Sequence, residues 1–113
     1  MKQNLFDIIP IVSKHITTEK EGALSVITFP RFNNRFMQKL FVPKNKSAIV
    51  RIRLDEHGTA VWSLIDGRRS VKKITELLAD HFQHEENYEY RIADFMLQLY
   101  KQGFVKKINY NKL

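Results

Sequence analysis

The side chains best suited to chemistry are a small group of histidines and acids in the second half of the sequence. His81 and Glu85 stand four residues apart, so they can share one face of a helix, and His84 lies beside them. A metal site needs a defined third and fourth donor, and two or three ligands at the end of a helix do not supply them. We therefore interpret these histidines as surface residues rather than as metal ligands.

Other catalytic and cofactor chemistry also lacks its usual residues. The sequence contains no cysteine, which excludes disulfides, zinc–thiolate sites and thiol catalysis. The four glycines are isolated from one another, so none of them belongs to a loop that could cradle a phosphate. Asp55 and Glu56 are adjacent, but at the expected start of a helix they serve its cap and its dipole. The sequence combines no nucleophile, base and orienting group, and it predicts a protein that is not an enzyme and has no cofactor.

The elements that position these residues are organised around one stretch, residues 48–67. Apolar and basic residues alternate over its first half, in the period-two pattern of a strand with one buried face: Val50, Arg51, Ile52, Arg53 and Leu54. The pattern changes at Asp55, whose carboxylate can cap a helix. Apolar residues then recur at helical spacing, and Gly67 is expected to close this helix in a left-handed conformation. We expect Trp62, in this helix, to lie in the core rather than in a ligand box.

The residues before this stretch predict strands, and those after it predict helices. Apolar runs at 23–30, 36–42 and 48–54 are separated by short turns, which predicts an antiparallel meander of three strands. Ser70 and Asn87 can each cap a further helix, and Gly103 ends the second of these. The expected later elements are helices at 70–82 or 70–84 and at 87–102, and a short C-terminal strand at 104–108. The fold class is therefore α+β.

The length of 113 residues suits one domain, which we expect at residues 23–113. Residues 1–22 form an apolar cluster that Pro10 interrupts, and we set them apart as an N-terminal arm. Two interpretations of the arm remain open, a segment packed back on the domain and a docking segment for a larger partner. No apolar run approaches the roughly 20 residues of a membrane span, and the N-terminus is not a convincing signal peptide. The lack of cysteine suits a cytoplasmic location.

The net charge of +7 is unevenly distributed along the chain. Residues 22–54 contain no acid, and they carry seven basic residues: Arg31, Arg35, Lys39, Lys44, Lys46, Arg51 and Arg53. A basic sheet beside nearly neutral helices indicates an acidic partner. The alternative is a solvated basic face that serves solubility.

The arrangement of several motifs resembles the coenzyme PQQ synthesis protein D (PqqD-like) family. The resemblance covers about residues 48–105, and residues 1–22 lie outside it. It is carried by a strand followed by Leu54-Asp-Glu-His-Gly-Thr-Ala-Val-Trp-Ser-Leu-Ile-Asp-Gly67, then Ser70-Val-x-x-Ile74, Leu77-x-x-x-x-Phe82, and Arg91-Ile-x-x-Phe95-x-x-x-Leu99-x-x-x-Gly103-Phe104. The paired Ile-Asp-Gly and Gly-Phe ends, at this spacing, are fairly specific.

This resemblance implies a winged-helix-like fold in which a three-stranded antiparallel sheet is followed by three helices. It also implies a non-catalytic peptide chaperone, of the type called a RiPP precursor peptide recognition element. Such a protein holds the leader of a ribosomally synthesised peptide and presents it to a modifying enzyme, often a radical SAM protein. The leader adds as a strand beside the third strand, in the cleft against the third helix. The residues implied to bind it here are Ile49, Arg51, Arg53, Arg91, Asp94, Phe95, Gln98 and Leu99, whereas Ile92 and Met96 are expected in the core.

The rival interpretation is a winged-helix DNA-binding protein, which the net charge and the order of strands and helices would suit. A helix that reads DNA is normally basic. The third helix instead balances Glu89 and Asp94 against Arg91 and Lys101, which argues against nucleic acid. A purely structural subunit is a third class, and an open sheet edge would also permit a homodimer.

Overall fold

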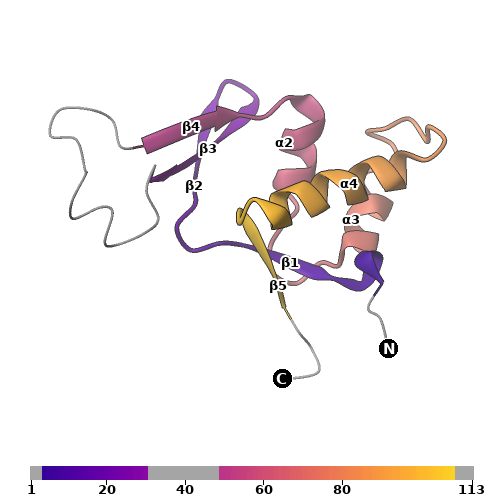
Figure 1. The fold of residues 1–113 in the computed structure, drawn as a ribbon. Coiled ribbons are helices and arrows are strands. Elements are labelled where there is room, and N and C mark those ends of the chain that lie inside the picture. The colour runs from indigo at the N-terminus through magenta and orange to yellow at the C-terminus, as the bar shows by residue number, and fades with distance from the viewer. Residues whose placement is uncertain (1–3, 31–48, 109–113) are drawn as a thin grey trace, which may run out of the picture.

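A computed structural model of the chain describes residues 4–30 and 49–108. Its sheet lies toward one end of the molecule and its helices toward the other (Figure 1). The elements in chain order are the 3₁₀ helix η1 (Leu5–Asp7), β1 (Ile9–Val12), β2 (Thr17–Glu21), β3 (Leu24–Pro30), β4 (Ile49–Arg53), α2 (Glu56–Trp62), α3 (Val71–Leu77), α4 (Tyr88–Lys101) and β5 (Val105–Ile108).

Two antiparallel sheets are present in the described residues. The larger has the strand order β2-β3-β4, and the smaller pairs β1 with β5. Three α-helices follow the larger sheet in the chain, and β5 follows the last of them. The predicted α+β, winged-helix-like fold with a short C-terminal strand is therefore confirmed.

The predicted order of strands within the sheet is wrong. Strand β3 pairs directly with β4, whereas the predicted meander has another strand between these two. Residues 36–42 themselves lie outside the part of the chain that the structure describes. The third strand is instead β2, which pairs with β3 across a two-residue turn in which Gly22 has a φ of +63°. Strand β2 has the sequence TTEKE and is exposed throughout, so it has no apolar alternation that could reveal it.

Residues 5–21, which were predicted to belong to an N-terminal arm, contribute a strand to each sheet. Strand β1 pairs with β5, and its Pro10 carbonyl accepts a hydrogen bond from the Gly67 amide at 3.1 Å. The Ile8 carbonyl accepts another from the Val71 amide at 2.9 Å. Residues 8–10 are thus bonded to the loop between α2 and α3 and to the first residue of α3.

The starts of α2 and α3 follow the predicted cap chemistry, and the start of α4 does not. The Asp55 side chain accepts a hydrogen bond from the Gly58 amide at 2.7 Å, and the Ser70 hydroxyl accepts one from the Lys73 amide at 3.0 Å. Asn87 occupies the N-cap position of α4, but its backbone is left-handed and its side chain makes no cap hydrogen bond. Helix α4 ends just before Gly103, as predicted, and Gly103 has a φ of +82°.

Two helix ends differ from the prediction. Gly67 is left-handed, with a φ of +78°, as predicted. It does not close helix α2, however, because α2 already ends at Trp62. Helix α3 ends at Leu77 rather than near residue 82 or 84. Gln83 and His84 both have positive φ values, which a continuing α-helix does not allow. The segment between α3 and α4 is therefore a series of turns.

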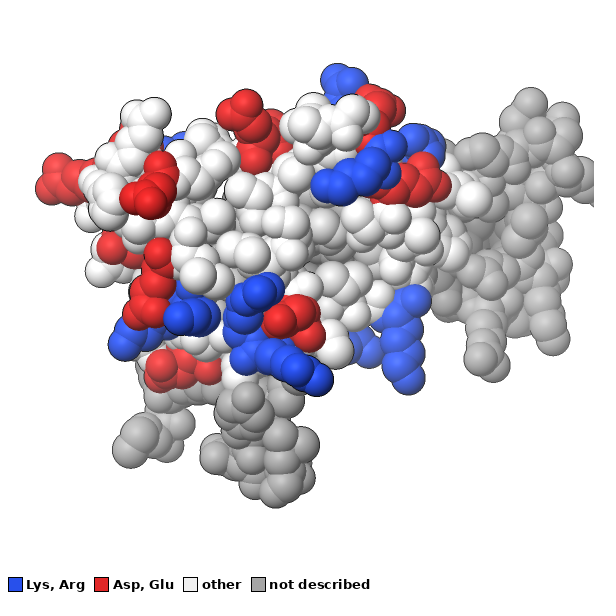
Figure 2. Space-filling model, turned by 180° about the vertical axis from the view of Figure 1, so that it is seen from behind, with Lys and Arg blue, Asp and Glu red and all other residues white. Residues whose placement is uncertain are grey.

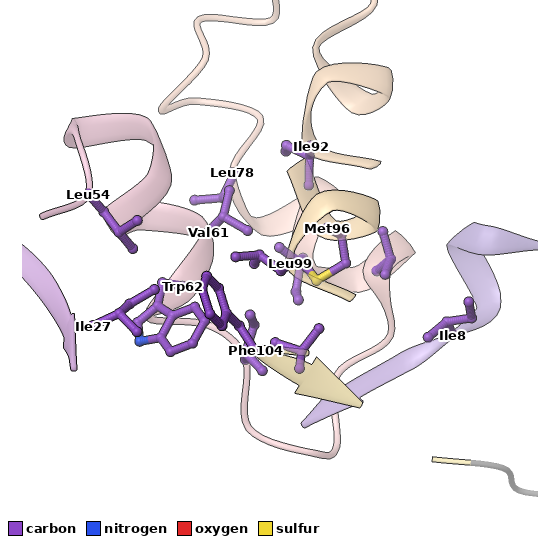
Figure 3. Close-up of a cluster of buried hydrophobic side chains, with 14 of the residues drawn as sticks. Ile8, Ile27, Leu54, Val61, Trp62, Leu78, Ile92, Met96, Leu99 and Phe104 are labelled. Atoms are coloured by element: carbon purple, nitrogen blue, oxygen red, sulfur yellow. The ribbon is translucent and has the colours of Figure 1, made fainter. Parts of the chain in front are cut away.

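One hydrophobic core joins the three α-helices to β3 and β5 (Figure 3). Trp62 lies in it with only 4% of its surface exposed, and its indole nitrogen donates a hydrogen bond to the Thr18 hydroxyl at 2.9 Å. The prediction that Trp62 is a core residue is confirmed. Ile92 and Met96 are buried in the same core, also as predicted.

The Ser70 cap gives a first testable prediction. Replacing Ser70 by alanine is expected to lower the free energy of unfolding by about 1 kcal/mol, because the first turn of α3 loses a side-chain acceptor. Urea denaturation at neutral pH measures the change. Ser63→Ala is the control, because the Ser63 hydroxyl bonds the Ala60 carbonyl at the end of α2 and caps no helix start. Equal effects of the two substitutions would contradict a special role for Ser70.

Candidate functional site

The main-chain groups on one side of β4 face away from the sheet. The Leu54 amide donates to the Ser25 carbonyl at 2.9 Å, and hydrogen bonding alternates along an antiparallel pair. Val50 and Ile52 therefore bond β3, whereas the N–H and C=O groups of Arg51 and Arg53 point to the opposite side. No other described strand pairs with β4 on that side.

The side chains of Arg51 and Arg53 lie across the exposed face of the sheet. Arg51 forms an ion pair with Glu19, and Arg53 donates to Glu21 at 2.9 Å. Both glutamates come from β2, so the ion pairs span β3. The two arginines are thus neutralised by their own sheet, and the basic face predicted for these strands is absent at this point.

The charge of the described residues is balanced as a whole. Residues 4–30 and 49–108 contain all 12 acids of the chain and as many lysines and arginines, so the net charge of +7 comes from residues 1–3, 31–48 and 109–113. Figure 2 shows positive and negative side chains interspersed on the face that it presents. On that face the described residues therefore form no broad basic patch for nucleic acid.

A pocket of about 220 Å³ lies beyond the end of β4, between α2 and α4. Its floor is apolar and its rim is charged, and its lining includes Asp55, His57, Val61, Phe82, Arg91 and Phe95. Gly58 also lines it, and a Cβ at this position would stand 3.2 Å from the Asp55 carboxylate and 3.3 Å from the Leu54 Cβ. Glycine thus leaves room for the Asp55 cap and the Leu54 side chain at the start of α2.

One flank of α4 faces this pocket. Arg91, Asp94, Phe95 and Gln98 follow helical spacing on that flank. Phe95 is half-buried in the pocket lining, and Asp94 and Gln98 are exposed. Leu99, which was predicted to bind the leader together with them, is 3% exposed and belongs to the core. The structure therefore groups Arg91 and Phe95 at the pocket and leaves Leu99 out of it.

Two pocket residues were not predicted from the sequence. Phe82 enters from the turns between α3 and α4, and the His57 ring stacks on it with a centroid distance of 4.6 Å. The Arg91 guanidinium lies over the Phe82 ring, 5.5 Å from its centroid. It also donates a hydrogen bond to the Glu85 carboxylate at 2.9 Å. No periodic pattern marks Phe82 as a site residue, because it lies outside a regular helix.

The histidines show no metal-binding arrangement. His57 Nδ1 lies 2.9 Å from His81 Nε2, and His84 Nε2 lies 2.9 Å from Asp80. All four of these side chains are exposed, in agreement with the predicted surface histidines. Within residues 4–30 and 49–108, no three histidine or acidic side chains gather closely enough to hold a metal ion.

Asp66 and Gly67 form a structural turn. The Asp66 carboxylate accepts hydrogen bonds from the Arg69 and Arg68 amides, both at 2.8 Å, and these bonds lower the pKa of Asp66. A Cβ at Gly67 would stand 3.1 Å from the Ile11 side chain of β1. The Ile-Asp-Gly motif therefore shapes the loop that receives the start of the chain.

The comparisons with known proteins identify the family. A family model described as coenzyme PQQ synthesis protein D (PqqD) matches residues 47–105, which is more than half of the chain and contains β4, the three α-helices and the pocket. Neither the curated proteins nor the solved structures yielded a match. No helix in the described ranges is long and apolar enough to cross a membrane. The chain belongs to the coenzyme PQQ synthesis protein D (PqqD) family.

Proposed function

We propose that this protein binds the leader of a ribosomally synthesised precursor peptide as an added strand at β4 and presents it to a modifying enzyme. Membership of the PqqD family implies a role in binding such a peptide, and its members act as non-catalytic accessory proteins. The observation that supports the site is the outward-facing main chain of Arg51 and Arg53 beside the pocket. A radical SAM protein is the proposed modifying enzyme.

Strand addition explains how this site would combine affinity with selectivity. An extended peptide can pair with the N–H and C=O groups of Arg51 and Arg53, and such main-chain bonds tolerate many sequences. Asp55, two residues beyond Arg53, already lines the pocket. A peptide that follows β4 would therefore pass its next residues over the apolar floor near Phe95. One large apolar side chain in that pocket would select among leaders.

The electrostatics favour a peptide over DNA. Arg51 and Arg53 form ion pairs with Glu19 and Glu21. The flank of α4 that faces the pocket includes the exposed Asp94. A duplex would therefore meet carboxylates beside each basic group, at a cost in affinity. We assign no DNA-binding role to this surface.

A titration of peptide and DNA side by side tests the proposal. The ligands are the short peptides encoded next to the gene and a duplex oligonucleotide, each titrated into the purified protein by calorimetry at 50 mM and 500 mM salt. We expect one peptide to bind at both salt concentrations, because main-chain bonds are less screened than exposed charges. Tight, salt-sensitive duplex binding without affinity for any of these peptides would reject the proposal in favour of a DNA-binding protein.

Phe95 gives a prediction for the pocket. Phe95→Ala is expected to weaken binding of that peptide by about tenfold or more, because a buried aromatic contact is a frequent source of binding energy. Tyr100→Ala is the matched control, because Tyr100 is an exposed aromatic residue on the same helix that does not line the pocket. Thermal denaturation of both variants separates a loss of binding from a loss of fold. If both variants fold and bind the peptide with equal affinity, the pocket is not part of the binding site.

A further inference from the structure

A second groove lies on the other flank of α4. It is bounded by η1, α3 and the first turn of α4, and it encloses about 490 Å³. Its lining includes Phe6, Asp7, Lys72, Glu76, Glu89 and Tyr90. Glu89 and Tyr90 face this groove, whereas Arg91 and Phe95 face the pocket described above. The elements that bound this groove lie toward the end of the molecule opposite β4 (Figure 1).

The groove carries an exposed aromatic surface. Tyr90 is 62% exposed, the largest exposure among the big apolar and aromatic residues that the structure describes. Its ring meets the Phe6 ring edge-on, with the centroids 5.9 Å apart. The pair is therefore held in place by the fold, yet one ring presents a free face to solvent.

The rim of the groove is acidic. Asp7, Glu76 and Glu89 form no ion pair with any residue in the described ranges, and Lys72 is the basic residue of the lining. The field of these acids reaches the Tyr88 hydroxyl, which donates to the Thr75 carbonyl at 2.9 Å. Burial, together with the charges of Glu89 and Glu76, raises the pKa of Tyr88. The groove thus combines a negative potential with an exposed tyrosine ring.

We propose that this groove is a docking surface for an arginine-bearing segment of a second protein. A guanidinium group can stack on the face of Tyr90 and bond a carboxylate in its own plane, which an ammonium group does less well. The acids on the rim supply the complementary charge. This inference does not rest on the peptide-binding proposal, because no residue of the β4 edge or of the α2–α4 pocket takes part in it.

The test uses hexa-arginine and hexa-lysine peptides as probes for the full-length protein. Backbone amide shifts in NMR spectra locate the binding, and their concentration dependence gives the Kd. We expect hexa-arginine to bind more tightly than hexa-lysine, with the largest shifts at residues 4–7, 72–76 and 88–90. Tyr90→Ala should weaken hexa-arginine about two- to fivefold, the range for an exposed cation–π contact.

Matched controls separate docking from general charge attraction. Tyr100→Ala removes an exposed tyrosine of the same helix outside the groove, and Glu86→Gln removes an exposed acid outside it. Glu89→Gln should weaken hexa-arginine more than Glu86→Gln does. Equal effects within either pair, equal affinity for both probes, or shifts spread over all acidic regions would overturn the proposal. Dimerisation in analytical ultracentrifugation that Tyr90→Ala abolishes would also overturn it, because the groove would then be covered by a second copy.

Discussion

Replacing Trp62 by alanine is expected to lower the free energy of unfolding by about 3–5 kcal/mol. The indole is almost fully buried where α2 meets the sheet, so its removal leaves a large cavity. The substitution also removes the donor for Thr18 of β2. Small domains have only about 5–15 kcal/mol of stability, so the variant should be close to unfolding. Urea denaturation followed by circular dichroism measures the change.

The variant Trp62→Phe separates the two contributions. It keeps most of the apolar volume and loses the hydrogen bond to Thr18, so it should cost markedly less than alanine does. A Trp62→Ala protein with an unchanged thermal midpoint would show that the indole does not hold α2 against β2. It would also reopen the interpretation of Trp62 as part of a ligand site.

Replacing Arg51 by proline is expected to weaken leader binding by at least about tenfold while the fold survives. The Arg51 amide points away from β3, so proline removes a donor to the incoming peptide and no hydrogen bond of the sheet. The loss of one main-chain bond and the bulk of the proline ring both oppose pairing. Calorimetric titration of the same leader peptide measures the effect, and circular dichroism reports the fold.

Arg51→Ala is the matched control for the proline variant. It keeps the amide and removes the same side chain, including the ion pair with Glu19, which is exposed and contributes little. We expect its leader affinity to stay within a few fold of the unchanged protein. If alanine and proline weaken binding equally, the arginine side chain rather than the β4 main chain carries the contact, and strand addition is the wrong mode.

The ion pairs of the sheet also decide which substitutions are informative. Charge reversal at Arg51 or Arg53 would place a third carboxylate beside Glu19 and Glu21, so it would disturb the sheet as well as any peptide. Variants that change the backbone donor avoid this second effect.

The sequence by itself determined the features that depend on neighbouring residues. The alternation around Ile52 predicts β4, and the side chains of Asp55 and Ser70 predict the starts of α2 and α3. The apolar stripe of α4 and the burial of Trp62 were also predicted correctly. Each of these follows from the period of a helix or strand, or from a hydrogen bond that spans three residues, so local order is sufficient.

Only the tertiary structure decided which distant segments meet. It placed the polar strand β2 beside β3, and it set Glu19 against Arg51, 32 residues along the chain. It likewise brought Phe82 onto His57 to wall the pocket, and it turned Leu99 into the core rather than toward the cleft. Such contacts depend on how all the elements pack around the core. They leave no periodic pattern in the sequence, so they cannot be predicted from it. The charge of the β4 surface and the shape of the pocket are therefore properties of the fold.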